Sequence, residues 1–492
     1  MASLKRAVAR TRAHGLQCAA YRGPRGEGEG EGVDFNVHEY MATASVARDM
    51  LRLVDETEAL RRREVAAARV RARAAGAQRS LDRGGDGGDG DDGDDGDEGV
   101  GGDQVDGVDG ADGASDGVDA PRPRLQYYGT SYGTVLGNTF LSMFPGRVKR
   151  MILDGVVIAD NWVRGNWDES ALDTHHALDY FYQTCFDAGA KCALRAGSDA
   201  SWHAVQHRVE ALVARLDEDP VPGAAVDGPE ISIDGRQVLD LLFGKLYAPL
   251  DLFEGLASTL AQAVGGNYTR LLAELVPPMS DKHDDEHDDE HDDEHDRPGN
   301  TDRAVAAILG PFTWGTEVFS SVACGDAHDL SGYPLSHWQH QLQELQARYP
   351  HQSAFIADQT IKCAGWQSRP RDRFAGPFRS PAPAPGPSDA GTDGHDAEQG
   401  RPSAPLLLLS TLYDPVTPLD SARAVARDHP GARVLVQNSV GHCTLLASPS
   451  ECTRRVIRAY MVDGTMPDEG LVCEGDCVPF ADCAFERGGL RR

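Results

Sequence analysis

The pentapeptide Gly129-Thr-Ser131-Tyr-Gly133 constrains this chain more than any other feature of its sequence. It stands between an apolar segment typical of a buried strand, 125–128, and a segment of small and apolar residues typical of a helix, 135–144. Glycines two positions before and after a serine relieve crowding on a tight strand-to-helix turn that exposes the hydroxyl. In a chain with 54 glycines the alternative is an ordinary turn. The flanking strand and helix favour a nucleophile at Ser131.

A serine hydroxyl is a weak nucleophile and needs a base, which an acid must orient. Asp414 follows the predicted strand 406–409, and His442 follows the predicted last strand, 433–437. The chain order Ser, Asp, His is the order found when the nucleophile occupies a strand-to-helix elbow. Each residue also has a simpler interpretation: Asp414 as a turn or helix-capping residue, and His442 as a structural or exposed histidine. Their order and their positions after strands favour a triad of Ser131, Asp414 and His442.

The predicted elements around Ser131 follow one another as strand, turn, helix and strand, which is a parallel α/β unit. The same alternation returns near the C-terminus, whereas 161–379 shows mainly helical patterns. We therefore predict an α/β fold in which two parts of one sheet, 1–160 and 405–466, flank a helical cap. Residues 380–404 are a linker rich in Pro, Ala and Gly, and 467–492 form a tail that contains cysteines.

Two tracts carry most of the net charge of −29: 84–120 has 14 acidic residues, and 281–296 has 11. Neither has enough apolar surface to order itself, so we predict disordered loops. Four histidines in the second tract recur at every fourth position, a spacing that could hold a metal on a helix, but repeated low-complexity sequence favours solvated disorder. We expect no metal and no cofactor. The negative charge repels nucleic acid and anionic membranes, so we also expect no nucleic-acid or membrane partner. The sequence has no run of 18 apolar residues and therefore predicts no membrane span.

Three segments resemble one known family. They are YYGTSYGTVLGNTFLSMFPGRVKRMILDGVV (127–157), the segment 405–473 that begins PLLLLSTLYDPVTPLD, and ATASVARDML (42–51). They are similar to the tripeptidyl-aminopeptidase-like and proline-iminopeptidase-like α/β-hydrolases, and the last part resembles the TAP-like C-terminal domain. The resemblance covers most of 42–473 outside the acidic tracts. It implies a secreted serine exopeptidase that acts on peptides with a free N-terminus through an acyl-enzyme on Ser131.

The resemblance also implies that the backbone N–H of Tyr132 is one oxyanion donor. Members of the family have several strands and a Gly-rich oxyanion loop before the helix that we place at Thr43, whereas the 42 residues before that helix contain no convincing strand. We therefore predict a hydrolase core that is incomplete on its N-terminal side, an unidentified second donor, and little or no activity. The alternatives are a non-catalytic binding protein on this fold, and an esterase or lipase.

The cysteines occur in closely spaced pairs, which favours an oxidising, extracellular or secretory compartment. Proximity along the chain makes candidate disulfides of Cys443 with Cys452, Cys185 with Cys192, and Cys324 with Cys363, the first closing a loop beside His442. Buried free thiols are the alternative. Asn267 begins an Asn-Tyr-Thr sequon and is a glycosylation candidate. The N-terminal segment has no apolar core of the kind that a signal peptide needs. The sequence gives no indication of oligomeric state.

Overall fold

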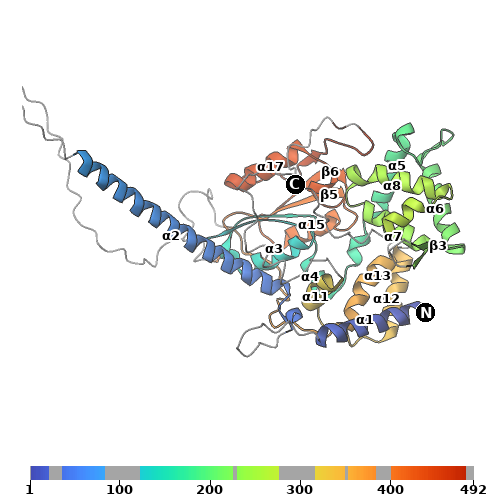
Figure 1. Ribbon diagram of the computed structural model, residues 1–492, viewed down its shortest axis with the longest axis horizontal. Helices are drawn as coiled ribbons and strands as arrows, with labels where there is room; N and C mark the ends of the chain where they lie inside the picture. The colour runs from blue at the N-terminus through green and yellow to red at the C-terminus, as the bar shows by residue number, and fades with distance from the viewer. Residues whose placement is uncertain are drawn as a thin grey trace, which may run out of the picture.

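A five-stranded parallel sheet forms the centre of the computed structural model, which describes residues 2–20, 36–83, 122–224, 230–275, 316–349, 353–383, 400–481 and 483 (Figure 1). The strand order is β1-β2-β5-β6-β7. The strands are β1 (Leu125–Thr130), β2 (Val148–Asp154), β5 (Leu407–Tyr413), β6 (Arg433–Val440) and β7 (Val472–Glu474). Because every pairing is parallel, the carboxyl ends of the strands share one edge of the sheet, where ligands bind in open α/β folds.

Helices cover both faces of this sheet, because successive side chains of a strand point to opposite sides. On one face Leu153 and Leu408 pack in a cluster with Phe140 and Val425. On the other face Ile152 and its neighbours pack against Tyr460 on the second helix after β6, which follows the short α16 (Cys443–Ala447). The first layer contains α2 (Thr43–Arg83), α3 (Tyr132–Met143) and α15 (Leu419–Arg427), and the second contains α17 (Glu451–Asp463). The predicted α/β class, with two separated parts of one sheet, is confirmed.

The segment inserted between β2 and β5 is mainly helical, as predicted, and forms two hydrophobic clusters. The first contains α5 (Thr174–Asp187), α6 (Trp202–Glu218), α7 (Gly235–Lys245), α8 (Pro249–Val264) and α9 (Thr269–Leu275), with the hairpin β3 (Val221–Ala224) and β4 (Glu230–Ile233). The second contains α4 (Ala159–Arg164), α11 (Thr316–Asp326), α12 (Leu335–Arg348) and α13 (Ser353–Lys362). Short 3-10 turns are η1 (Val37–Glu39), η2 (Pro145–Arg147), η3 (Asp168–Ala171), η4 (Gly189–Lys191) and η5 (Cys363–Gly365). The antiparallel hairpin was not predicted.

Helix α1 (Ala2–Ala20) packs on the cap, although 1–160 was predicted to belong to the sheet domain. Leu4 and Val8 lie in the same cluster as Trp366, which follows η5. The backbones approach so closely that a Cβ added to Gly15 would lie 1.7 Å from the carbonyl oxygen of Gly365. Only glycine allows this contact. The N-terminal helix is therefore a part of the cap rather than of the sheet domain.

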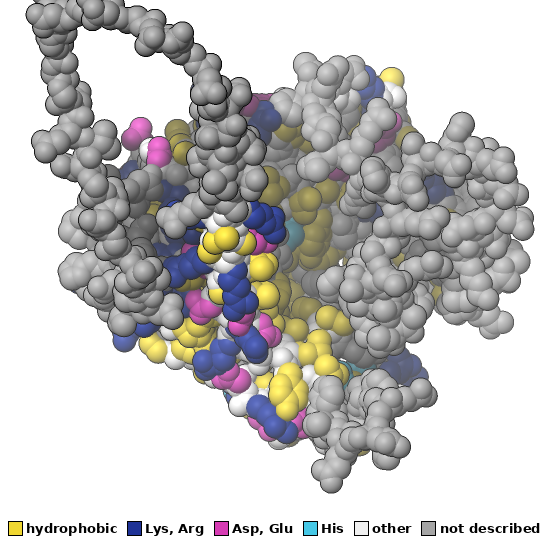
Figure 2. Space-filling view, turned by 60° about the vertical axis from the view of Figure 1, so that its left-hand side comes forward, with side chains coloured by type: hydrophobic (Ala, Val, Ile, Leu, Met, Phe, Trp, Pro, Cys, Tyr) yellow, Lys and Arg dark blue, Asp and Glu magenta, His cyan; other side chains and the backbone are white. Residues whose placement is uncertain are grey.

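Helix α2 starts beside α3 and then projects away from the sheet (Figure 1). Ala47, Met50 and Leu51 near its start contribute to the cluster on that face of the sheet. Farther along, Leu60 and Val70 are more than half exposed. Figure 2 looks toward the side from which α2 projects and shows basic, acidic and apolar side chains mixed there. The helix ends at Arg83, and over 60–72, where its side chains are exposed, it is held by local helical bonds rather than by packing.

Within the described ranges, no helix is both long and apolar enough to cross a membrane. Strand β1 pairs with β2 and with no other described strand, so it is an edge strand of the sheet. The acidic tract 84–120 and the His-Asp-Asp-Glu repeats of 281–296 lie outside the described residues, as does most of the predicted linker.

Candidate active site

Ser131 occupies a sharp turn between β1 and α3, as the glycine spacing predicted. Its backbone has φ 52° and ψ −123°, a conformation that a residue with a side chain rarely adopts. A Cβ on Gly129 would lie 2.5 Å from the carbonyl oxygen of Gly133, so the turn closes only with glycine at position 129. The N–H and hydroxyl of Thr134 both donate to the carbonyl oxygen of Ser131, at 2.8 and 2.6 Å. These bonds hold a strained conformation of the kind that is concentrated at functional sites.

Asp414 and His442 form a buried acid and base pair beyond the ends of β5 and β6. The Nδ1 atom of His442 lies 3.0 and 3.1 Å from the two carboxylate oxygens of Asp414. Backbone N–H groups of Val416, Thr417 and Cys443 also donate to this carboxylate, at 2.8–2.9 Å. Asp414 is 0% exposed and His442 is 3% exposed. The carboxylate thus holds the imidazole in one orientation and leaves Nε2 as the atom for proton transfer.

The electrostatics of this pair favour the charged form of both groups. Burial opposes ionisation of Asp414, but the charge of His442 and the hydrogen bonds from His442 and the backbone outweigh it and hold the pKa of Asp414 below its usual value. Burial likewise disfavours the imidazolium, but the charge of Asp414 and its hydrogen bond raise the pKa of His442 above the usual value. The imidazolium that would form during proton abstraction is therefore stabilised.

The serine turn and the histidine loop meet at the carbonyl oxygen of Asp154, the last residue of β2. The N–H of Ser131 donates to this oxygen at 3.0 Å. The thiol of Cys443, next to His442 in the chain, donates to the same oxygen at 3.5 Å. Among the described residues no hydrogen bond joins the side chains of Ser131 and His442, and catalytic hydrogen bonds are often long before substrate binds. The fold therefore brings the three predicted site residues to one edge of the sheet.

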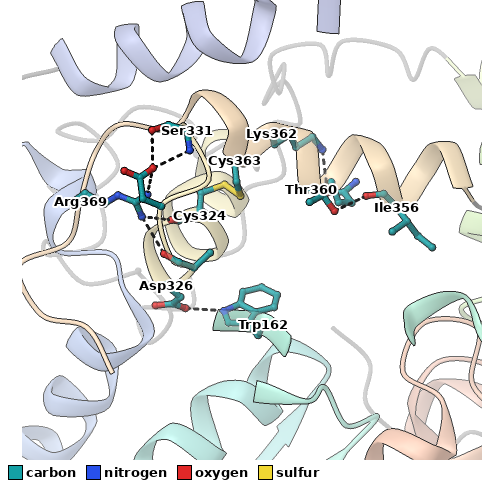
Figure 3. Close-up of a disulfide and its surroundings, with 12 residues drawn as sticks. Trp162, Cys324, Asp326, Ser331, Ile356, Thr360, Lys362, Cys363 and Arg369 are labelled. Carbon is teal, nitrogen blue, oxygen red and sulfur yellow. Dashed lines mark hydrogen bonds and ion pairs between the residues drawn. A yellow bond between two sulfur atoms is a disulfide. The ribbon is translucent and has the colours of Figure 1, made fainter. Parts of the chain in front are cut away.

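Tyr132 begins α3, so its N–H is one of the donors that a helix start leaves without an intrahelical acceptor, and such groups suit a developing anion. Its hydroxyl lies 2.7 Å from the hydroxyl of Thr43, which also donates to the buried carboxylate of Asp326. Asp326 accepts from the indole of Trp162 at 2.9 Å as well, and Figure 3 shows this contact beside the disulfide that holds α11. The residue after Ser131 is thus anchored to both the cap and the start of α2.

Sequence reasoning missed two residues that touch the histidine loop. The carbonyl oxygen of Tyr247 accepts the N–H of His442 at 2.9 Å, and the two rings meet edge to face with centroids 4.9 Å apart. The carboxylate of Asp154 accepts a hydrogen bond from the hydroxyl of Thr444. A strand that ends in Asp-Gly was a usable signal for Asp154, because carboxyl ends of parallel strands carry site residues. No pattern marks Tyr247, since it lies in a cap turn.

Four disulfides are present, and one expected pairing is wrong. Cys185 is joined to Cys192, and Cys324 to Cys363, as predicted. Cys452 pairs with Cys473 rather than with Cys443, which is a buried free thiol. The side chain of Cys443 points toward Asp154 at the site, whereas Cys452 lies on α17, which covers the opposite face of the sheet next to β7. The tail also contains a disulfide between Cys477 and Cys483.

The predicted glycosylation candidate lies on the surface. Asn267 is exposed in the turn between α8 and α9, where its side-chain oxygen accepts the N–H of Thr269 at 3.1 Å, so its position is accessible to a glycosylating enzyme.

Ligand-type atoms of Asp414, His442 and Cys443 lie within 4.8 Å of one another. The hydrogen bond between the first two already engages Nδ1, so this cluster fits proton transfer better than metal coordination.

Comparisons with known proteins agree with the α/β-hydrolase fold class. Residues 349–473 match the family described as TAP-like protein, which extends farther toward the N-terminus than the predicted domain 405–466. A tripeptidyl aminopeptidase of Streptomyces lividans is 22% identical over 361 residues, which are 72% of this chain and 56% of the relative. The serine protease Hip1 of Mycobacterium tuberculosis (strain ATCC 25618 / H37Rv) is 25% identical over 362 residues, 71% of this chain and 58% of the relative.

The chain therefore spans somewhat more than half the length of these curated relatives. The predicted resemblance to tripeptidyl-aminopeptidase-like hydrolases is confirmed for the C-terminal part by the family match, and for a larger part of the chain by the relatives at low identity. From its parallel sheet, its serine elbow and this family match, we conclude that the chain has an α/β-hydrolase fold and contains a TAP-like domain at residues 349–473.

Proposed function

We propose that this chain is a serine hydrolase of the peptidase type that forms an acyl-enzyme on Ser131. The observation that carries the proposal is the buried Asp414–His442 pair, whose loop meets the strained Ser131 turn at one carbonyl oxygen. In this mechanism Nε2 of His442 takes the proton of the Ser131 hydroxyl as its oxygen attacks the substrate carbonyl. His442 then gives that proton to the leaving amine. Asp414 stays ionised and stabilises the imidazolium throughout.

The developing oxyanion would be held by the N–H of Tyr132. This group lies at the start of α3, where the helix dipole adds a partial positive charge. The contacts of the Tyr132 hydroxyl to Thr43 favour a fixed backbone at this position. A prearranged donor of this kind typically raises turnover on the order of a hundredfold to a thousandfold. We assign no second donor, and the little or no activity that we expect from the sequence for this reason stays a prediction.

We further propose that the substrates are peptides with a free N-terminus, from which one or a few residues are released. This part rests on similarity to tripeptidyl aminopeptidases, which are named for that activity. The cap covers the carboxyl edge of the sheet, which suits an exopeptidase because a cap limits how far a chain can enter. Four disulfides favour an oxidising compartment, so we propose that the enzyme acts outside the cytoplasm.

An activity probe and a substrate series test the proposal. A fluorophosphonate should label wild-type protein at Ser131, and Ser131→Ala should not be labelled. Aminoacyl and tripeptidyl amides with a free N-terminus should be cleaved faster than the same amides carrying an N-acetyl group, and faster than short-chain esters. Preference for esters would favour an esterase. A folded wild-type protein that neither labels nor cleaves any of these substrates would favour a non-catalytic binding protein.

A further inference from the structure

Asp154 is a second buried carboxylate at the site, and the proposed mechanism does not use it. It is 0% exposed and ends β2, opposite Thr130 of β1. Its Oδ1 accepts the backbone N–H of Thr444 at 2.8 Å, and its Oδ2 accepts the hydroxyls of Thr444 and Tyr128 at 2.7 and 2.8 Å. Burying a carboxylate is costly unless donors surround it. The three donors explain how this one is tolerated, and they leave open what it does there.

Its main chain and its side chain reach different halves of the site. The carbonyl oxygen of Asp154 holds the N–H of Ser131 at 3.0 Å, while the carboxylate holds Thr444, two residues after His442. The nucleophile and the base come from chain segments more than 300 residues apart. A single residue therefore connects the two loops on which the separation of the Ser131 hydroxyl and the His442 imidazole depends.

We propose that Asp154 is a positioning residue of the active site, which sets the approach of His442 to Ser131 by holding the histidine loop with its carboxylate. The inference rests on the proposed hydrolase function for its catalytic consequence. Its structural content, that the Asp154 carboxylate fixes the loop after His442, is independent of turnover. Proton transfer requires hydrogen-bond distance, so a loop that relaxes by about 1 Å would lower the rate on the order of a hundredfold.

The same carboxylate also acts on the imidazole electrostatically. The groups that face His442 are Asp414, Asp154, Cys443 and Tyr247, and Tyr128 faces Asp154. Burial first, and the nearby carboxylates second, raise the pKa of the Cys443 thiol and of both phenols, so these three groups are neutral. Asp414 is then the stronger anion that favours the imidazolium, through direct contact. Asp154 adds to it in its ionised form, although burial first, and the charge of Asp414 as well, raise the pKa of Asp154 itself.

Two substitutions separate position from charge. Asp154→Asn keeps the shape of the side chain, and its amide NH₂ can donate to the hydroxyls of Tyr128 and Thr444, which can turn to accept. Asp154→Ala removes every side-chain contact and leaves the N–H of Thr444 unpaired. We expect Asp154→Ala to lower plateau kcat about a hundredfold with KM nearly unchanged. We expect Asp154→Asn to stay within about tenfold of wild type, because the loop keeps its anchor.

The pH profile tests the charge. Asp154→Asn should move the acid limb of kcat/KM to lower pH, because neutral His442 then persists at lower pH. The matched control is Asp199→Asn, which neutralises another nearly buried carboxylate, one that pairs with Arg208 in the cap. It should leave the acid limb in place. Thr444→Val, which removes one donor of the contact, should add little to the loss caused by Asp154→Ala, because both act through one interaction.

A readout without turnover keeps the inference separate from the proposed function. Titration of the His442 imidazole by NMR on histidine-labelled protein should show a lower pKa in Asp154→Asn than in wild type. If wild type is neither labelled nor active but this shift occurs, the hydrolase proposal fails and the role of Asp154 at the histidine loop stands. Plateau kcat in folded Asp154→Ala within threefold of wild type, or an unshifted imidazole titration in Asp154→Asn, would overturn the inference.

Discussion

Replacing Asp414 by asparagine tests the buried acid and base pair most directly. The carboxylate receives donors on both oxygens: Val416 and Thr417 on Oδ1, Cys443 on Oδ2, and Nδ1 of His442 on both. An asparagine offers one acceptor oxygen. If that oxygen keeps the N–H groups of Val416 and Thr417, the asparagine NH₂ takes the place of Oδ2. It then faces the N–H of Cys443, and Nδ1 of His442 must accept a hydrogen bond from it. The imidazole proton then moves to Nε2, and the base can no longer take the proton of Ser131.

The expected magnitudes follow from these contacts. Turnover should fall by about four orders of magnitude, the cost of the wrong tautomer in such a site. The unpaired N–H of Cys443 should lower the free energy of unfolding by about 1–3 kcal/mol. Residual activity should show its acid limb at lower pH, because the charge that raises the pKa of His442 is gone. Steady-state kinetics from pH 4 to 9 and thermal unfolding measure all three effects.

The pH dependence of stability has a definite sign. His442, whose pKa is raised in the folded protein, contributes stability that is present below its ordinary value of 6.5 and is lost as pH rises through the folded value. Asp414, whose pKa is lowered, contributes stability that is present above 3.8 and is lost as pH falls through the folded value. The difference in free energy of unfolding between wild type and Asp414→Asn should therefore be largest between pH 3.8 and pH 6.5. Asp414→Asn with turnover within tenfold of wild type and an unmoved acid limb would refute the mechanism.

Three further perturbations have clear expected results. Ser131→Gly should abolish turnover and yet raise the melting temperature, because glycine relieves a strained φ of 52° that costs about 1–3 kcal/mol, and an unchanged or lower melting temperature would contradict this strain. Gly129→Ala should destabilise the protein by about 1–3 kcal/mol and abolish fluorophosphonate labelling, since its Cβ would lie 2.5 Å from a carbonyl oxygen, and normal labelling would rule out that crowding. Deleting 84–120 or 281–296 should change the free energy of unfolding by less than about 0.5 kcal/mol, as judged by denaturant titration, and loss of folding would show that the tract is structured.

Features set by local geometry could be predicted from the sequence. The glycines around Ser131 mark the turn because crowding within five residues decides its shape. The strands before Asp414 and His442 are apolar runs with clear ends, and their order along the chain placed both residues at one edge of the sheet. The disulfide between Cys185 and Cys192 could be predicted because these residues are seven positions apart.

Features that depend on side-chain direction or on distant contacts could not be predicted. Cys443 is close to Cys452 in sequence, but the positive φ of Cys443, 61°, turns its thiol toward Asp154. The packing of α1 on the cap depends on two glycines 350 positions apart, Gly15 and Gly365, which no periodic pattern relates. The hairpin of β3 and β4 is short and contains Pro222, a residue that argues against a strand.

The two buried carboxylates that hold the histidine loop, Asp154 and Asp414, indicate that this region is organised for more than stability. A fold gains little from burying Asp154 and Asp414 together, because each is desolvated and the charge of Asp414 further disfavours ionisation of Asp154. Apolar side chains would fill the same space at lower cost. Instead, consecutive backbone N–H groups of the histidine loop, at Cys443 and Thr444, are divided between the two carboxylates. The loop after His442 is thus held on two sides by fixed acceptors, which limits the positions open to the imidazole and supports a role in proton transfer rather than in packing.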